Sequence, residues 1–328
     1  MIFYNFYNFY NFYNFYTCFY IYNYEYDINI TTYSHVDNIH RISIFSLFKM
    51  ASSKKTYYGK ANSTATNSVV TTATTTASTS SSDDVKPISI SKDAVKRLLK
   101  DIGEIIKTPL HDQGIYYKHS ETVILEGWAL IIGPKDSLYR DGYYFFKIEF
   151  PTDYPHAPPV LHYYTNDGIT RFHPNFYKSG KVCIDILNTW RGEKWSGCQT
   201  ISSVLLTLVS IMDNEPILNE PGITKKNSDY LNYHNLVEYR NFSFSIYELI
   251  HSIENFCKYI PIKEKEHSDY FYSIMKAHYV SNKDSIMKKL QENKERILHP
   301  EIVHSSLYLF GFKIDYTQLM SLFEKLTM

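Results

Sequence analysis

What this 328-residue chain lacks limits the kinds of chemistry it can perform. It has only four cysteines, Cys18, Cys183, Cys198 and Cys257, and no two of them form a Cys-x-x-Cys pair. We therefore expect neither a metal site nor a disulfide framework, and a reducing cytoplasmic or nuclear setting fits. Lys and Arg balance Asp and Glu to a formal charge of zero, so no broad field favours nucleic acid or an anionic membrane. The chain also lacks an apolar run of membrane-spanning length and a phosphate-binding Gly-rich loop.

The first 88 residues of the chain have little of the apolar periodicity of a folded domain. Residues 1–50 form an aromatic leader with four Asn-Phe-Tyr repeats, and a period of three matches neither a helix nor a strand. No basic segment precedes it, so we do not expect a signal peptide. Residues 51–88 are rich in Ser and Thr, as in a disordered linker. Translation from Met50 would remove the leader from the native protein, and a targeting role for the leader is the alternative.

Ordered structure is expected from about Ser89, in the arrangement of an α+β fold. Ser91 is a plausible N-cap, apolar residues then recur at helical spacing, and Pro109 ends the helix. Strand-like segments joined by short turns predict an antiparallel meander, at residues 114–119, 122–132, 142–150 and 159–164. A second amphipathic helix is predicted over 201–212, and helical patterns dominate residues 223–328.

The segment from residue 171 to residue 195 carries the most specific motifs. A His173-Pro174-Asn175 triplet precedes Cys183 by eight residues, with Gly180 between them. A proline-rich segment, 151–159, comes before it, and Trp195-Ser196-Gly197-Cys198 leads into the second helix. This series of motifs resembles the active-site region of ubiquitin-conjugating enzymes, the E2s.

The resemblance implies a UBC-like fold and an enzyme that carries ubiquitin as a thioester. Such a fold has an N-terminal helix, a four-stranded antiparallel meander, the active-site segment and then helices. We expect the UBC catalytic domain at 89–250 and a helical C-terminal extension at 251–328. The length of the chain and Asn219-Glu220-Pro221-Gly222 look like the large E2s served by the alternative ubiquitin-activating enzyme (E1). No cofactor is implied, because the E1 uses the ATP.

The resemblance also assigns roles to the residues of the triplet and to the cysteine. Cys183 would accept ubiquitin or a related modifier from an E1 and pass it to lysine amines of protein substrates, usually with an E3 ligase. Asn175 would stabilise the oxyanion, although it could equally only tie the loop together. His173 and Pro174 would be structural. The alternatives are that Cys183 is an ordinary buried cysteine, or that Cys183 and His173 form a thiol-protease pair.

Two features near Cys183 depart from the compact E2s. The family's acidic gate residue has no clear counterpart here, and the acidic candidates are Asp185, Glu215 and Glu220. Trp195 lies twelve residues after Cys183, further than in compact E2s. The longer loop, residues 188–194, would select acceptor lysines or hold the ubiquitin tail, or else be a surface insertion.

By position in the family, the partner-binding residues lie on the first helix and on two loops. They are Lys96, Arg97, Pro155, His156, Pro158, Trp195 and Ser196. A hypothesis from another class is a non-catalytic E2-like scaffold that presents ubiquitin to other proteins. Such scaffolds lack the active-site cysteine, and this chain has Cys183 and Asn175, so the sequence favours the enzyme.

Overall fold

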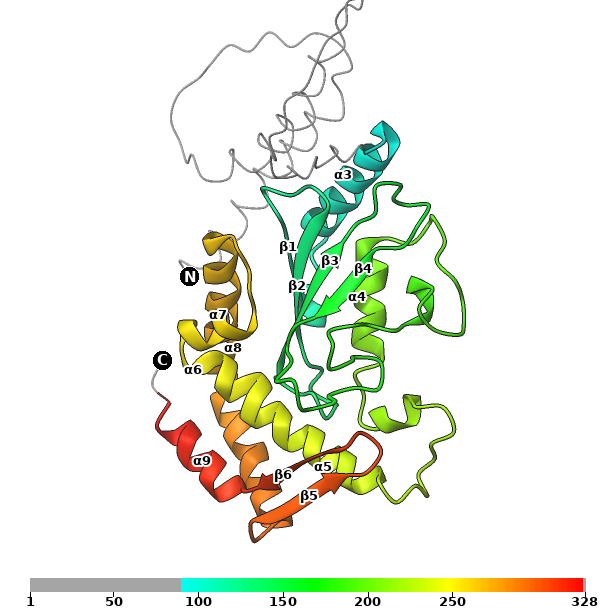
Figure 1. The fold of residues 1–328 in the computed structure, drawn as a ribbon. Helices are drawn as coiled ribbons and strands as arrows, with labels where there is room; N and C mark the ends of the chain where they lie inside the picture. Colours follow the sequence, from blue (N-terminus) through cyan, green and yellow to red (C-terminus); the bar gives the residue numbers. More distant parts are fainter. Residues whose placement is uncertain (1–89, 327–328) are drawn as a thin grey trace, which may run out of the picture. The chain divides into compact units, whose positions relative to one another are not determined.

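The computed structural model describes residues 90–326, which begin with the predicted helix (Figure 1). Helix α3 (Lys92–Lys107) has Ser91 as its N-cap, and the Ser91 side chain accepts a hydrogen bond from Ala94 N at 3.0 Å. The helix stops before Pro109, whose ring disfavours helical backbone at the residue before it. The predicted leader and linker lie outside the described residues. Within the described residues, no helix combines the length and the apolar character needed to cross a membrane.

The sheet is the predicted antiparallel meander, in the order β1-β2-β3-β4. Its strands are β1 (Ile115–His119), β2 (Glu126–Ile132), β3 (Tyr143–Glu149) and β4 (Val160–Tyr163). Phe146 pairs with Ala129 on one side and with Tyr163 on the other, which fixes the register of β3 at the centre of the sheet. The α+β class, the N-terminal helix and the four-stranded meander predicted from the sequence are therefore confirmed.

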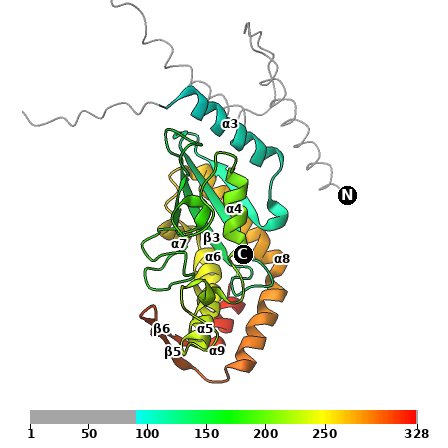
Figure 2. The same ribbon diagram turned by 90° about the vertical axis from the view of Figure 1, so that its right-hand side faces the viewer.

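Both faces of the central strand are buried, because β3 contains four consecutive aromatic residues, Tyr143 to Phe146, each 0% exposed. On one face, the Phe146 ring lies 5.2 Å from the ring of Phe176 in the active-site segment. On the other face, the Phe145 ring packs against C-terminal helices, 5.3 Å from Phe256 and 5.5 Å from Phe271. Figures 1 and 2 show α4 on one side of the sheet and α7 and α8 on the other.

Helix α4 (Ile201–Ser210) begins with a capping box in which Thr200 and Ser203 exchange side-chain and backbone hydrogen bonds. Short helices connect the other elements: η2 (His111–Gln113), η3 (Asp185–Leu187) and η4 (Pro216–Asn219). The remaining helices and strands follow in the order α5 (Tyr230–Arg240), the π-helical η5 (Asn241–Glu248), α6 (Leu249–His251), α7 (Ile253–Tyr259), α8 (Lys265–Arg296), β5 (Glu301–Ser305), β6 (Phe310–Ile314) and α9 (Tyr316–Glu324).

The C-terminal extension differs from the prediction of helices alone, because β5 and β6 form an antiparallel hairpin. Two features of the sequence conceal it. On β5, the polar Ser305 is buried and the apolar Ile302 is 70% exposed, so the sequence lacks the regular alternation of a half-buried strand. The turn has Leu309 in the left-handed region at φ 52°, where Gly or Asn is the usual signal.

Candidate active site

Backbone and side-chain hydrogen bonds bring Asn175 and Cys183 together. The Cys183 N–H donates to the Asn175 carbonyl at 3.0 Å, and Asn175 Nδ2 donates to the Cys183 carbonyl at 2.5 Å. The chain between them folds back on itself, with Phe176 bridged to Val182 and with Gly180 at φ 86°. The predicted nucleophile and the predicted amide donor are therefore direct neighbours.

His173 is fully buried, and both of its ring nitrogens bind the backbone. Nδ1 accepts from the Asn175 N–H at 3.0 Å, so Nε2 carries the proton that it donates to the Ile211 carbonyl at 3.0 Å. Burial lowers the pKa of His173 to about 3, so the ring is neutral at physiological pH. With both nitrogens occupied, the ring has none left to activate Cys183 as in a thiol protease. Pro174 is buried within the same turn.

Arg171 is a residue of this site that the sequence reasoning missed. Its side chain holds the turn, with Nε donating to the His173 carbonyl at 3.1 Å and Nη2 to the Pro174 carbonyl at 2.6 Å. The guanidinium lies 3.6 Å from the centroid of the Tyr177 ring. No local pattern marks Arg171, because its neighbours Thr170 and His173 are polar and nothing in the sequence shows that its side chain is buried.

The loop at residues 188–194 is exposed but fixed where it begins. Asn188 Oδ1 accepts from the Trp195 N–H at 2.8 Å, so the two ends of the loop are joined. The Thr189 hydroxyl accepts from the Ile184 N–H at 3.0 Å, which ties the loop to the residue after Cys183. Cys183 itself is only 2% exposed.

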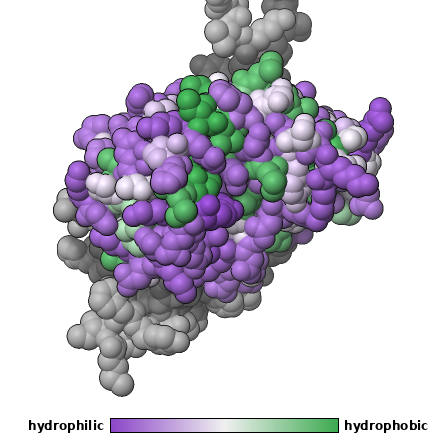
Figure 3. Space-filling view, turned by 90° about the horizontal axis from the view of Figure 1, so that it is seen from below, coloured by the Kyte–Doolittle hydropathy of each residue, from purple (hydrophilic) through white to green (hydrophobic). Residues whose placement is uncertain are grey.

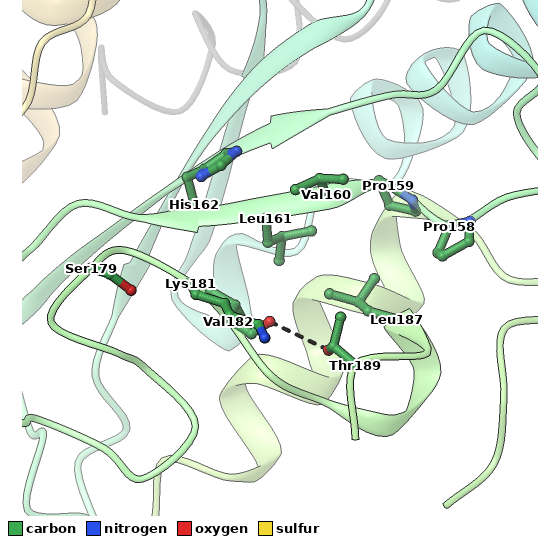
Figure 4. Close-up of a pocket in the computed structure, with 10 residues that line it drawn as sticks. All are labelled: Pro158, Pro159, Val160, Leu161, His162, Ser179, Lys181, Val182, Leu187 and Thr189. Atoms are coloured by element: carbon green, nitrogen blue, oxygen red, sulfur yellow. Dashed lines mark hydrogen bonds between the residues drawn. The ribbon is translucent and has the colours of Figure 1, made fainter. Parts of the chain in front are cut away.

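A groove of about 260 Å³ lies beside Val182, the residue before Cys183 (Figure 4). Leu161, Val182 and Leu187 give it an apolar wall, and the Thr189 hydroxyl donates to the Val182 carbonyl at 3.3 Å. The groove therefore runs between strand β4 and the backbone that holds the cysteine.

Each of the three acidic candidates forms hydrogen bonds with residues other than Cys183 and Asn175. Asp185 accepts from the Ile186 N–H at 2.8 Å. Glu215 pairs with Lys225 and accepts from Tyr230, and these hydrogen bonds lower the pKa of Glu215. Glu220 accepts from the Tyr308 hydroxyl at 2.7 Å. Among residues 90–326, no hydrogen bond joins any of the three carboxylates to Cys183 or Asn175.

Asp185 also contacts the long loop. A side chain at Gly192 would lie 2.7 Å from the Asp185 Cβ, so the loop backbone is packed against this residue.

The two loops assigned to partner binding are joined to each other, because Trp195 Nε1 donates to the Pro155 carbonyl at 2.7 Å. Pro158 is half-buried, whereas His156 and Ser196 are exposed.

The two basic residues on α3 differ from each other. Lys96 is exposed, but the Arg97 guanidinium is committed within the fold. It pairs with Asp101 at 2.9 Å, donates to the Gln199 carbonyl at 2.6 Å and also donates to the Gly197 carbonyl. Arg97 therefore fastens α3 to the loop before α4.

No metal centre is evident in this part of the chain. Across residues 90–326, His, Cys, Asp and Glu side chains form no group of three or more that could hold a metal ion.

Comparison with known proteins agrees with this geometry. A family model described as "Ubiquitin-conjugating enzyme" matches residues 97–241. The chain is 36% identical over 163 residues to ubiquitin-conjugating enzyme E2 Z of Xenopus tropicalis, covering 49% of this chain and 51% of that protein. Human E2 Z is 36% identical over 157 residues, covering 47% of this chain and 44% of that protein. The solved structure of human ubiquitin-conjugating enzyme E2 G1 is 30% identical, with a TM-score of 0.33, and the match covers 37% of this chain and 94% of that one.

The chain spans about half the length of the curated relatives that it matches. The matched residues include the sheet, the His-Pro-Asn turn, the cysteine and helix α4. Because the motifs, the match to the family model and the similarity to E2 Z agree, the chain belongs to the ubiquitin-conjugating enzyme family and contains its UBC domain.

Proposed function

We propose that the protein is an E2 that accepts ubiquitin or a related modifier from an E1 as a thioester on Cys183. It then transfers the modifier to lysine amines of protein substrates, usually with an E3 ligase. The observation that supports the proposal is the pair of hydrogen bonds between Asn175 and the backbone of Cys183, because they hold the Asn175 side-chain amide next to the residue that has the thiol.

The chemistry needs a group that attacks and later leaves. The Cys183 thiolate attacks the carbonyl carbon of the E1 thioester, a new C–S bond forms, and the E1 thiolate leaves. A lysine amine then attacks the same carbon, the C–N bond forms, the C–S bond breaks and the amine nitrogen loses a proton. Cysteine suits both steps because a thiol is acidic, with an unperturbed pKa of about 8.5.

Asn175 supports the second step as an oxyanion donor. Its amide nitrogen has two hydrogens, and only one is needed for the Cys183 carbonyl. The other can bind the oxyanion while the first holds the loop, so the two roles proposed for Asn175 are compatible. Removing such a donor costs on the order of 10²–10³ in rate.

Among the three acidic candidates, we prefer Asp185 as the residue that would lie near the attacking lysine. Glu215 is paired with a cation and Glu220 with a phenol, whereas the described partner of Asp185 is its neighbour's N–H. Its packing against Gly192 places it beside the long loop, which we propose helps select acceptor lysines.

The partners of the family are ubiquitin, an E1 and E3 ligases, and we assign them to the surface formed by α3 and the two joined loops. Lys96, His156 and Ser196 are exposed there. We extend the proposal to the alternative E1, on the resemblance to the large E2s, and to a cytoplasmic or nuclear location, on the cysteine usage.

The low exposure of Cys183 favours a second candidate, a scaffold that binds ubiquitin without carrying it. A single-turnover charging assay separates the two. The protein is mixed with ubiquitin, ATP and each of two E1 enzymes and run on non-reducing gels beside Cys183→Ala and Cys183→Ser. The enzyme gives a reductant-sensitive adduct that is absent from the Ala variant and becomes a reductant-resistant ester in the Ser variant. If neither E1 gives an adduct although ubiquitin binds, the scaffold is the better description.

A further inference from the structure

The turn of the C-terminal hairpin lies against the active-site turn. Tyr308, in that turn, has its ring centroid 5.5 Å from the guanidinium carbon of Arg171. The Tyr308 carbonyl accepts from Lys178 Nζ at 3.2 Å, so both its ring and its backbone contact the active-site segment. Its hydroxyl donates to Glu220 at 2.7 Å.

The hairpin turn is held rigidly by Asp229 at the start of α5. The buried Asp229 carboxylate accepts from the Ser305 hydroxyl at 2.5 Å, from the Ser306 N–H at 2.9 Å and from the Leu307 N–H at 3.2 Å. The Tyr308 ring also packs on Tyr233 of α5, with the ring centroids 5.2 Å apart. A turn fixed at this many points cannot shift without disturbing α5.

Arg171 depends on this contact because it is a buried cation without a carboxylate partner. It is 9% exposed, and among the described residues no ion pair includes it. Two backbone carbonyls and the faces of Tyr177 and Tyr308 surround its guanidinium. A desolvated cation is stabilised by an aromatic face more strongly than an exposed one.

The contacts continue from Arg171 to the cysteine. Arg171 holds the carbonyls of His173 and Pro174, and the next residue, Asn175, exchanges hydrogen bonds with Cys183. We propose that Tyr308 is a positioning residue for the active-site turn, acting through Arg171 on the orientation of Asn175 toward Cys183. This inference rests on the proposed function, because the turn is the part that transfers the modifier.

The test is the discharge of the thioester to free lysine, measured for the full chain in single turnover after the E1 has been stopped. Tyr308→Leu keeps apolar volume on Tyr233 but removes the aromatic face, and we expect its discharge rate at saturating lysine to fall about tenfold. The half-saturating lysine concentration should stay unchanged, because Tyr308 does not touch the acceptor. Tyr308→Phe keeps the face and loses only the bond to Glu220, so it should discharge at nearly the wild-type rate.

Three further variants separate positioning from loss of stability. Arg171→Lys keeps the positive charge but loses the planar guanidinium group. Because this substitution leaves the hairpin intact, it tests the contact between Arg171 and Tyr308 even if Tyr308→Leu folds poorly. The double variant with Arg171→Lys and Tyr308→Leu should discharge about as slowly as the slower single variant, because both substitutions remove the same contact. Leu309→Asn is the matched control on the same turn, because Leu309 is 86% exposed and Asn tolerates its backbone. Figure 3 shows the molecule from below, the side on which Figure 1 draws the hairpin, and this face is largely hydrophilic with some hydrophobic residues between.

The outcomes distinguish this inference from the proposed function. If the wild type is not charged, the proposed function fails and the inference falls with it. If the wild type is charged and Tyr308→Leu discharges like Leu309→Asn, the inference alone is wrong. The inference is also overturned if Tyr308→Phe and Tyr308→Leu slow discharge equally, each in proportion to the fall in its unfolding temperature. It is overturned as well if the discharge rate of the double variant falls by the product of the two single-variant effects.

Discussion

Acid should destabilise this protein partly through His173, and the size of the effect follows from its environment. Burial, assisted by the nearby cation of Arg171, lowers the pKa of His173 from 6.5 to about 3. Between these two values the unfolded chain binds a proton that the folded protein does not, so unfolding is favoured as the pH falls. The contribution is fully present above about pH 6.5 and is lost progressively below it. From pH 7 to pH 5 the loss amounts to about 2 kcal/mol of the free energy of unfolding.

The variant His173→Asn isolates this contribution. An Asn side chain can accept the N–H of the residue two positions on, as in an Asx turn, so the bond to Asn175 N is retained without a titrating group. The Ile211 carbonyl loses its partner, which should cost about 1–3 kcal/mol at neutral pH. His119 and His234, whose pKa values burial lowers to about 4, are present in both proteins, and their effects cancel in the difference.

The assay is urea unfolding followed by tryptophan fluorescence at pH 7, 6 and 5. We expect the variant to be less stable than the wild type at pH 7 and the gap to narrow by about 2 kcal/mol at pH 5. A gap that stays constant across this range would show that His173 titrates alike in the folded and unfolded states. The neutral, backbone-bound histidine described above would then be wrong.

Three other changes test separate parts of the site and its support. Asn175→Ala should slow transfer from the charged enzyme by about 10²–10³ if its amide binds the oxyanion, and a loss below tenfold in the discharge assay would leave it only a loop-tying role. Asp229→Ala removes the acceptor of three hydrogen bonds from the hairpin turn and should lower the free energy of unfolding by about 3 kcal/mol, measured in urea; no change would mean that the turn is held elsewhere. Arg97→Ala should weaken E1 and E3 binding more than Lys96→Ala does, because it frees the loop at Gly197, and equal effects in a binding titration would contradict that view.

Local patterns made the first half of the fold predictable. The first helix has apolar periodicity between its Ser91 cap and Pro109, and the four strands are short apolar or aromatic segments separated by turn residues, so all of these signals are local. The contact between Asn175 and Cys183 was also expected, but through the resemblance to E2s rather than through any residue pattern.

The support of the active site could not be read from the sequence in the same way. Arg171 and Tyr308 are far apart in the chain, and their contact depends on a hairpin turn that Asp229 holds on α5. No periodicity or motif specifies such a pairing. The hairpin itself was missed because its buried Ser305 and exposed Ile302 contradict the pattern by which strands are recognised.

The packing of β3 indicates why the C-terminal residues belong to the same core as the UBC domain. A strand buried on both faces needs a layer on each side, and the consecutive aromatic residues Tyr143 to Phe146 meet that condition here. Phe145 packs against α7 and α8, and the Tyr143 hydroxyl donates to the Met275 carbonyl of α8 at 3.0 Å. The same extension supplies Tyr308 to the active-site turn. The C-terminal extension both covers the sheet and contacts the active-site turn. A substitution that destabilises this extension should therefore lower the rate of transfer from Cys183 as well as the free energy of unfolding.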